Sequence, residues 1–322
     1  MESPTPSGER VLVTGGAGFV GSHLVEALVE ENDVVVLDDL STGSRSHLPA
    51  EATLVEGDVR DDAALERAAR DVDLIYHQAA IVSVERTVDS PRATNRTNLD
   101  GSLAVLERAR IEDARVVLAS SAAIYGEPTE VPVAETAPAD PLSPYGVQKL
   151  AADEYAARYE ALYDLPTVSL RYFNVYGPRQ RGPYSGVISA FFSKANAGEP
   201  LTVDGDGKQT RDFVYVDDVV RANLLAAETT AVGEAFNVAS GERASIRELA
   251  ETVRELTGTS VPIVHGEPRP GDVRHSVADL TKSTEVLGYE PRVDLIDGLN
   301  SLFDSAQRSD ESGPGQHSTA SE

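Results

Sequence analysis

The chain contains no cysteine among its 322 residues, which excludes disulfide bonds and thiolate chemistry. Its six histidines are scattered without HxxxH or HExxH spacing, so no metal site is expected. No stretch approaches the roughly 18 consecutive apolar residues of a membrane-spanning helix. The N-terminal segment is polar and proline-rich rather than basic and then apolar, so no signal peptide is expected and a cytoplasmic location is predicted.

Lysine is also scarce in this chain. Among 28 basic residues, which face 53 acidic ones, the lysines are Lys149, Lys194, Lys208 and Lys282. The resulting net charge of -25 repels nucleic acid and anionic membranes, so neither is expected as a partner. The acidic residues are spread along the whole chain. We expect a solvated acidic surface adapted to high salt, where screening relieves self-repulsion, and therefore a halophilic source.

Strand-like apolar runs alternate with helical patterns through the first half of the chain. Strands are predicted at 10–14, 33–37, 52–56, 72–76, 115–119 and 167–171, and helices at 20–30, 61–70, 95–109 and around 145–149. Repeated βα units with continuously apolar strands imply a parallel sheet covered on both faces. The predicted fold class is therefore α/β, with a Rossmann-like doubly wound sheet.

After residue 178 glycine and proline become frequent and the predicted strands shorten. We expect helices at 187–197 and 245–256, the second with a capping box formed by Ser245 and Glu248. Short strands are predicted at 212–216 and at 235–238, and the second could return to the main sheet. This pattern predicts a smaller α/β domain that follows the first one in the chain.

A glycine-rich loop joins the first predicted strand to its helix. Gly15, Gly18 and Gly21 have GxxGxxG spacing, which permits a tight turn and close approach of a pyrophosphate to backbone N–H groups. The second strand ends at Asp38, where a carboxylate hydrogen-bonds the adenosine ribose and repels a 2′-phosphate. The loop therefore predicts a dinucleotide site, with NAD favoured over NADP.

Tyr145 and Lys149 are four residues apart, so on a helix they project from one face. A free tyrosine titrates near 10 and is a poor base at neutral pH. A neighbouring ammonium and a positive nicotinamide ring favour the phenolate, which makes Tyr145 a usable general acid/base. Ser121, from the serine pair 120–121, is expected to hydrogen-bond the reacting oxygen.

From about residue 10 to about residue 305, these motifs resemble the extended short-chain dehydrogenase/reductase family, in its NAD-dependent epimerase/dehydratase branch. The resemblance is closest to UDP-glucose (UDP-N-acetylglucosamine) 4-epimerases. It implies catalytic roles for Ser121, Tyr145 and Lys149, of which Tyr145 and Lys149 also bind the cofactor. The other NAD contacts that it implies are Gly15, Gly18, Phe19, Val20, Gly21, Asp38, Asp39, Asp58, Val59, Gln78, Ala79, Ala80 and Asn98.

The loop at 121–126 discriminates among activities of the family. Dehydratases of nucleotide sugars carry an Asp-Glu pair there, and decarboxylases carry a glutamate, whereas this chain has Ala122 and Ala123. Epimerase–reductases acting on GDP-sugars rely on a cysteine, which is absent here. The resemblance therefore implies 4-epimerisation of a UDP-hexose through a transient 4-keto sugar, with UDP-glucose/UDP-galactose, UDP-GlcNAc/UDP-GalNAc or both as substrates.

The substrate site is also implied by matching motifs. In the family, the asparagine of the segment 171–179 contacts the sugar nucleotide, and arginines of the segments 210–218 and 269–272 bind its phosphates. Ser276 stands where a bulky residue excludes an N-acetyl group. The full predicted set is Ser83, Ser121, Tyr145, Asn174, Val203, Arg211, Arg269, Asp272 and Ser276.

These motifs divide the chain, and the alternatives to the leading interpretation remain open. The predicted division is a disordered segment at 1–8, an NAD-binding Rossmann domain at 9–178 with return segments near 213–240, a substrate-binding domain at 179–212 and 241–305, and a disordered acidic tail at 306–322.

Alternative activities are a UDP-glucuronate 4-epimerase and a nucleotide-sugar dehydratase or decarboxylase. A non-enzymatic NAD-binding regulator is disfavoured by the intact triad. The resemblance to the family also implies that the protein is a homodimer.

Overall fold

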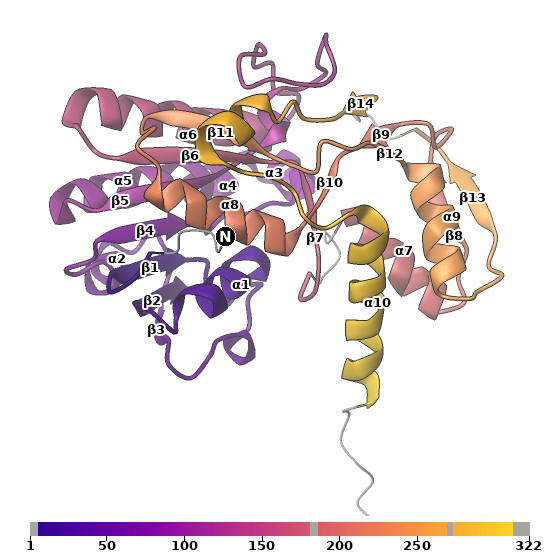
Figure 1. The fold of residues 1–322 in the computed structure, drawn as a ribbon, viewed down its shortest axis with the longest axis horizontal. Helices are drawn as coiled ribbons and strands as arrows, with labels where there is room; N and C mark the ends of the chain where they lie inside the picture. Colours follow the sequence, from indigo (N-terminus) through magenta and orange to yellow (C-terminus); the bar gives the residue numbers. More distant parts are fainter. Residues whose placement is uncertain (1–5, 181–185, 269–272, 312–322) are drawn as a thin grey trace, which may run out of the picture.

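The main body of the protein is a seven-stranded parallel sheet (Figure 1). The structure, a computed structural model, describes residues 6–180, 186–268 and 273–311, the last six of these by their backbone alone. Across the sheet the strand order is β11-β6-β5-β4-β1-β2-β3. The strands are β1 (Arg10–Thr14), β2 (Asp33–Asp38), β3 (Thr53–Glu56), β4 (Leu74–His77), β5 (Arg115–Ser121), β6 (Thr167–Tyr172) and β11 (Glu234–Val238).

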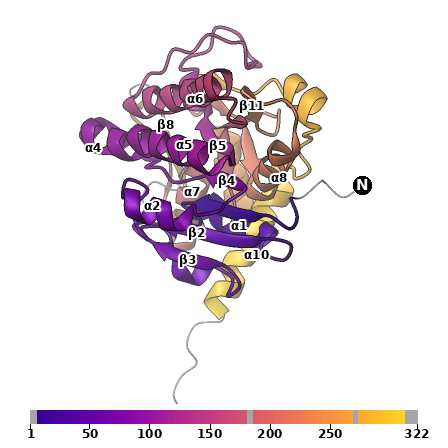
Figure 2. The same cartoon turned by 90° about the vertical axis from the view of Figure 1, so that its left-hand side faces the viewer.

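Helices cover both faces of this sheet, as Figure 2 shows. On one face lie α1 (Phe19–Leu28) and α8 (Val216–Glu228), which contact each other, and on the other lie α2 (Asp62–Ala68), α5 (Gly101–Glu112) and α6 (Pro144–Tyr163). The shorter α3 (Val84–Asp89), α4 (Pro91–Asn95) and the π-helix η2 (Arg96–Asp100) pack at the N-terminal end of α6. The doubly wound fold predicted from the sequence is confirmed.

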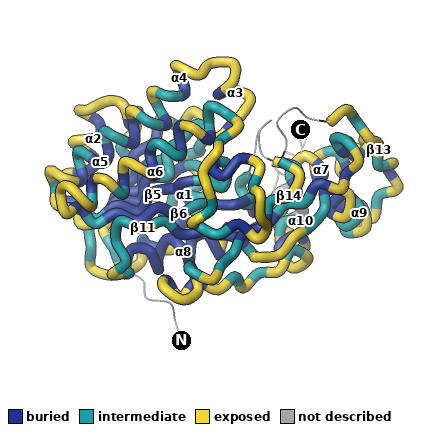
Figure 3. Tube along the Cα trace, turned by 90° about the horizontal axis from the view of Figure 1, so that it is seen from above, coloured by how far each residue is buried: buried dark blue, intermediate teal, exposed yellow. Residues whose placement is uncertain are grey.

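The continuously apolar strands explain this two-sided packing. Successive side chains of a strand point to opposite faces, so Val11 and Val13 of β1 enter the core beneath α1 and α8, while Leu12 enters the core beneath α2, α5 and α6. All three side chains are fully buried, and the buried strands form the centre of the molecule in Figure 3. A strand with alternating polar residues could not be buried on both faces.

A smaller lobe lies at one end of the sheet, to the right in Figure 1. Its helices are α7 (Gly186–Asn196), α9 (Ile246–Leu256) and α10 (Leu295–Glu311). Its short strands form three small sheets: β7 (Asn174–Tyr176) with β10 (Phe213–Tyr215); β12 (Ala244–Ser245) with β9 (Thr210–Arg211) and β14 (His275–Ser276); and β8 (Leu201–Asp204) with β13 (Ile263–Gly266). The predicted capping box at the start of α9 is confirmed.

The structure differs from the sequence analysis in several local elements. The strand expected at 212–216 ends at Tyr215, because Val216 begins α8, a buried helix that the sequence pattern did not reveal. The pattern also missed α10, whose helical backbone continues to Glu311, past residue 306, where the acidic tail was predicted to begin. Leu299 of α10 is fully buried and Phe303 stacks on Phe192 of α7, so tertiary contacts hold this polar helix in place. The 3₁₀ turns η1 (Arg45–His47) and η3 (Ala122–Ile124) and the π-helical turn η4 (Ser283–Leu287) were also not predicted.

Among the helices of the described ranges, none combines the length and apolar character that crossing a bilayer requires. The proposed division of the chain at residue 178 stays a prediction. β11 joins the main sheet and α8 packs against it, and both lie in the stretch near 213–240 where return segments were predicted.

Candidate active site

The predicted site residues gather where the parallel strands end. Thr14, Asp38, His77 and Ser121 are the last residues of β1, β2, β4 and β5. In open α/β sheets, ligands bind outside these carboxyl ends. The helix α6 begins beside the same edge and carries Tyr145 and Lys149.

The loop from β1 to α1 is tight because three backbone segments approach one another. Gly15 has φ +69°, and a Cβ on it would lie 2.7 Å from the nitrogen of Ala79. A Cβ on Gly21 would lie 2.2 Å from the carbonyl oxygen of Gly15. Gly18 is the N-cap of α1 and leaves the first N–H groups of Phe19 and Val20 without a side-chain cap. This loop can therefore hold a pyrophosphate, as the glycine spacing predicted.

The carboxylate of Asp38 closes the same loop. Its Oδ2 accepts a hydrogen bond from the nitrogen of Ala17 at 2.9 Å, and its Oδ1 accepts one from the nitrogen of Leu40 at 2.8 Å. Burial raises the pKa of Asp38, and the two backbone donors oppose that rise. Each oxygen keeps a lone pair that a ribose hydroxyl could use. The carboxylate of Asp39 instead accepts hydrogen bonds from Ser41.

Asp58, one of the NAD contacts that the family resemblance implies, lies shortly after β3. It pairs with Arg60, which lowers the pKa of the carboxyl. The N-cap of α2 is Asp61, whose side chain accepts from Ala63 and Ala64. Asp58 is therefore not a helix cap. Its neighbour Val59 is buried.

Three of the other predicted binding residues are engaged by the protein itself. The side chain of Gln78 bonds to Tyr172 and Asn223, both at 3.1 Å. Asn98, in the π-helical turn η2, exchanges hydrogen bonds with the backbone of Ile81 at 2.7 and 2.9 Å. These bonds fix the segment that carries Ala79 and Ala80. Ser83 is the N-cap of α3, and its hydroxyl oxygen accepts a hydrogen bond from the nitrogen of Arg86.

Tyr145 and Ser121 meet where α6 approaches the end of β5. Burial raises the pKa of Tyr145 to about 12, and hydrogen bonding to Ser121 acts in the opposite direction. Without further positive charge the phenol would stay protonated at neutral pH. Ser121 is thus within hydrogen-bonding reach of the Tyr145 hydroxyl, and its contact with the reacting oxygen stays a prediction.

Lys149 lies one turn further along α6 and is 5% exposed. Its Nζ donates a hydrogen bond to the carbonyl oxygen of Ala119 at 2.7 Å. Burial lowers the pKa of Lys149 to about 8, and the charge of Asp153 partly opposes that fall. Burial also lowers the pKa of His77 to about 3, so this neighbour adds no positive charge at neutral pH.

Gly146 is a functional position that the sequence analysis missed. A Cβ there would lie 2.6 Å from the carbonyl oxygen of Ala123 and 2.8 Å from Cβ of Pro141. The missing side chain therefore lets α6 come close to η3, the turn that follows Ser121. A glycine directly after the tyrosine was the available signal, but the contact that requires it lies in another segment.

On the side of the smaller lobe, Asn174, Arg211 and Ser276 come together. The side-chain amide of Asn174 donates to the carbonyl oxygen of Asp212 at 2.8 Å, and Arg211 pairs with Ser276 across β9 and β14. Val203, by contrast, is wholly buried in the lobe's core, so its side chain does not line a surface. The predicted phosphate and ribose contacts at Arg269 and Asp272 lie outside the described residues.

Asp212 ties this region together and was not predicted. Its side chain is fully buried and accepts hydrogen bonds from Ser240 and from the nitrogens of Gly241 and Ala278. Burial raises the pKa of Asp212, and these donors oppose the rise. The carboxylate thereby holds together the segments that carry Arg211 and Ser276.

Among the described residues, no group of three or more histidine, aspartate and glutamate side chains could hold a metal ion. A glycine-rich phosphate loop, and a tyrosine and a buried lysine one turn apart on the helix at the same sheet edge, define a dinucleotide-dependent enzyme. The particular family follows from comparison with known proteins. The model of the NAD dependent epimerase/dehydratase family matches residues 11–239, and the chain belongs to this family. Its cofactor is NAD, for which the loop and Asp38 are suited.

Relatives within the family differ in activity. The structure of a UDP-glucose 4-epimerase from Thermotoga maritima with UDP-glucose is 39% identical, covers 93% of this chain and 99% of its own, and superposes with a TM-score of 0.90. A UDP-N-acetylglucosamine 4-epimerase from Methanobrevibacter ruminantium, in complex with UDP-N-acetylmuramic acid, is 35% identical with a TM-score of 0.90 and coverages of 94% and 100%. UDP-glucuronic acid decarboxylase 5 of Arabidopsis thaliana is 37% identical, over 91% of this chain and 88% of its own.

The close approach at Gly146 generates a prediction. Gly146→Ala should push α6 away from η3 and lower the turnover rate by about 10- to 100-fold, since small misplacements of reacting groups are costly. Gly266→Ala is the matched control, because an added Cβ there finds no atom nearer than 3.5 Å. Steady-state kinetics and a thermal melt of each variant separate activity from stability. Wild-type rates in Gly146→Ala would contradict this role.

Proposed function

We propose that the protein is an NAD-dependent UDP-hexose 4-epimerase. The observation that carries the proposal is the turn η3, which follows Ser121 and faces Tyr145. It presents Ala122 and Ala123, so the turn offers no side chain for eliminating water or promoting loss of carboxylate. The chemistry left to the site is oxidation at one carbon and reduction of the same carbon.

When bound, NAD supplies a reversible hydride acceptor. Tyr145 takes the proton of the C4 hydroxyl as the 4-keto sugar forms, and returns it when the opposite face is reduced. Ser121 hydrogen-bonds the C4 oxygen, and the positive charge of Lys149 favours the phenolate. No net oxidation occurs, because the hydride removed from C4 returns to C4.

Incubation of the purified protein with UDP-glucose, UDP-N-acetylglucosamine and UDP-glucuronate, each followed by chromatography, tests this proposal. We expect the 4-epimer of at least one UDP-hexose without added reductant. A UDP-pentose or a deoxy sugar as product would favour the decarboxylase or dehydratase alternative. Conversion of UDP-glucuronate alone to its 4-epimer would favour the UDP-glucuronate 4-epimerase. Binding of NAD without turnover would favour the non-enzymatic regulator.

Tyr145→Phe should lower the rate of epimerisation by at least about 100-fold, because it removes the proton-transferring hydroxyl and leaves the ring in place. The measurement is turnover at saturating UDP-sugar, with NAD content determined on the same preparation. Tyr163→Phe, at the exposed C-terminal end of the same helix, is the matched control and should keep the wild-type rate. Near-wild-type turnover in Tyr145→Phe would remove Tyr145 from its proposed role.

The sugar pocket is proposed to admit an N-acetyl group. Ser276 is half-buried in β14 and pairs with Arg211 of β9, which supports a place for it beside the bound nucleotide sugar. A serine leaves space that a tyrosine would fill. UDP-glucose and UDP-N-acetylglucosamine are therefore both proposed substrates.

Ser276→Tyr should abolish activity on UDP-N-acetylglucosamine and preserve activity on UDP-glucose, because a steric clash penalises the larger sugar. The ratio of kcat/KM for the two substrates measures the effect, and a selective loss of about 100-fold is expected for a clash of this kind. Ser276→Ala is the control for loss of the hydroxyl. Equal losses on both substrates would contradict the gate.

We also propose a homodimer that buries part of α6. Val147, Tyr155 and Leu162 are exposed and spaced to lie on one face of this helix. Ile111 is exposed on α5, which lies beside α6 in Figure 2. Light scattering tests the proposal, and a monomeric mass at all salt concentrations would contradict it.

A halophilic source and a cytoplasmic location stay predictions, supported by the net charge of -25. If the acidic surface is adapted to salt, the melting temperature should rise by about 10 °C or more between about 0.1 M and about 3 M KCl, because screening weakens charge repulsion. Sucrose is the control, since it favours compact states without screening charge. A flat profile in KCl, or an equal rise in sucrose, would contradict the halophilic prediction.

A further inference from the structure

Asp153 is a buried carboxylate that the proposed chemistry does not use. It lies one turn after Lys149 on α6 and is 5% exposed. Its Oδ2 accepts a hydrogen bond from the Ser120 hydroxyl at 3.2 Å and one from Nε of Arg171 at 2.8 Å. A carboxylate this deeply buried is stable only when paired, so its position is strongly determined.

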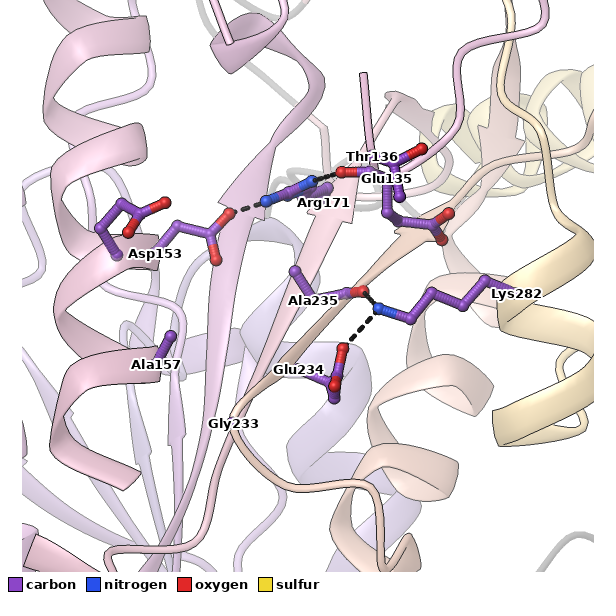
Figure 4. A pocket seen from close by; sticks show the side chains of 10 residues that line it. Glu135, Thr136, Asp153, Ala157, Arg171, Gly233, Glu234, Ala235 and Lys282 are labelled. Atoms are coloured by element: carbon purple, nitrogen blue, oxygen red, sulfur yellow. Dashed lines mark hydrogen bonds and ion pairs between the residues drawn. The ribbon is translucent and has the colours of Figure 1, made fainter. Parts of the chain in front are cut away.

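Arg171 is itself held from the side opposite to α6. Its Nη1 donates to the hydroxyl of Tyr125 at 3.0 Å and to the carbonyl oxygen of Glu135 at 2.8 Å. Its guanidinium also lies 5.4 Å from the centre of the Tyr125 ring. Figure 4 shows Arg171 between Asp153 and Glu135, in a surface pocket that is also lined by Lys282. The arginine is thus held between Asp153 on one side and Tyr125 and Glu135 on the other.

The same contacts reach the catalytic residues through β5. Ser120 stands opposite Arg171 in the β5–β6 ladder and directly precedes Ser121. The residue before it, Ala119, accepts the hydrogen bond of the Lys149 ammonium. Asp153 therefore contacts β5 at Ser120, which lies between Ala119, the acceptor of the Lys149 hydrogen bond, and Ser121.

We infer that Asp153 is a positioning residue for Tyr145 and Lys149. Asp153 holds β5 at Ser120 and maintains the positive charge of Lys149. Arg171 sets the strength of this effect, because it neutralises part of the carboxylate's charge. Asp153 touches neither the proposed sugar nor the reacting atoms, and it acts through Lys149 and Ser120. The inference rests on the proposed function only for its activity readout.

The charged and titratable groups around Lys149 are few. Asp153 and Tyr145 lie on the same helix, His77 comes from β4, and Arg171 comes from β6 behind Asp153. Asp153 raises the pKa of Lys149, which burial has lowered to about 8. Since that value is close to neutral, loss of the carboxylate should leave less of Lys149 charged at neutral pH. Loss of Arg171 should do the opposite, because the carboxylate then acts on Lys149 alone.

The scarcity of lysine makes a direct measurement possible. With ¹⁵N-labelled lysine, the NAD-bound protein gives signals from four side-chain amines, and Lys149→Arg assigns the one of interest. We expect the titration midpoint of Lys149 to fall by about one pH unit in Asp153→Asn and to rise in Arg171→Gln. Glu154→Gln is the matched control, because this neighbouring acid lines the same pocket but is exposed and pairs with Arg158.

Opposite shifts are the decisive outcome, since general loosening of the fold would move both variants in the same direction. An unchanged midpoint in Asp153→Asn, or shifts of the same sign in the two variants, would overturn the inference. If Asp153→Asn fails to fold, Arg171→Gln still tests the inference. A titration midpoint of Lys149 that does not rise in Arg171→Gln would contradict the inference.

The pH dependence of turnover gives a second readout. If Lys149 acts in its charged form, activity declines as pH rises through its pKa. That decline should begin at lower pH in Asp153→Asn and at higher pH in Arg171→Gln, with KM for the UDP-sugar little changed. A lower rate with an unshifted profile would indicate a purely structural role. If the wild type epimerises no UDP-sugar, the proposed function fails while the lysine titration still tests this inference.

Discussion

Parallel pairing of β1 with β2 on one side and with β4, which in turn pairs with β5, on the other brings the phosphate loop, Asp38 and Ser121 to one edge of the sheet. Parallel strands end at the same edge of a sheet, so residues far apart in the chain arrive together at the carboxyl ends. Because both faces of the sheet are buried, helices must cover each face, and α1 and α6 therefore begin at that edge. The phosphate loop and the Tyr145 helix follow from this one constraint.

Close backbone approach is the second constraint on the site. Gly15 and Gly21 allow the phosphate loop to fold against itself and against residue 79, while Gly146 allows α6 to reach the turn after Ser121. At each position a single methyl group would collide with backbone atoms, which cannot move aside as a flexible side chain can. The geometry of binding and of proton transfer thus depends on absent side chains as much as on present ones.

Burial of charge is the third theme of the structure. The chain carries a large negative charge, yet Lys149, Asp153 and Asp212 are buried, and the partly buried Arg171 pairs with Asp153. The partners of Asp153 and Asp212 come from several elements, so each carboxylate links segments that are distant in sequence. Such groups are costly to leave unpaired, and they therefore fix local geometry tightly.

The sequence alone determined the doubly wound sheet, the phosphate loop and the Ser121–Tyr145–Lys149 set, because apolar runs and short motifs express local physical requirements. It missed α8 and α10, since a helix that is stabilised by tertiary packing need not show a strong local pattern. The assignments of Val203 to the substrate contacts and of Asn98 and Gln78 to the NAD contacts stay predictions. The fold buries the side chain of Val203 and gives Asn98 and Gln78 hydrogen bonds within the protein. Only the tertiary structure decided the roles of Gly146, Asp153 and Asp212, because the atoms that each one contacts come from distant segments that meet only in the folded chain.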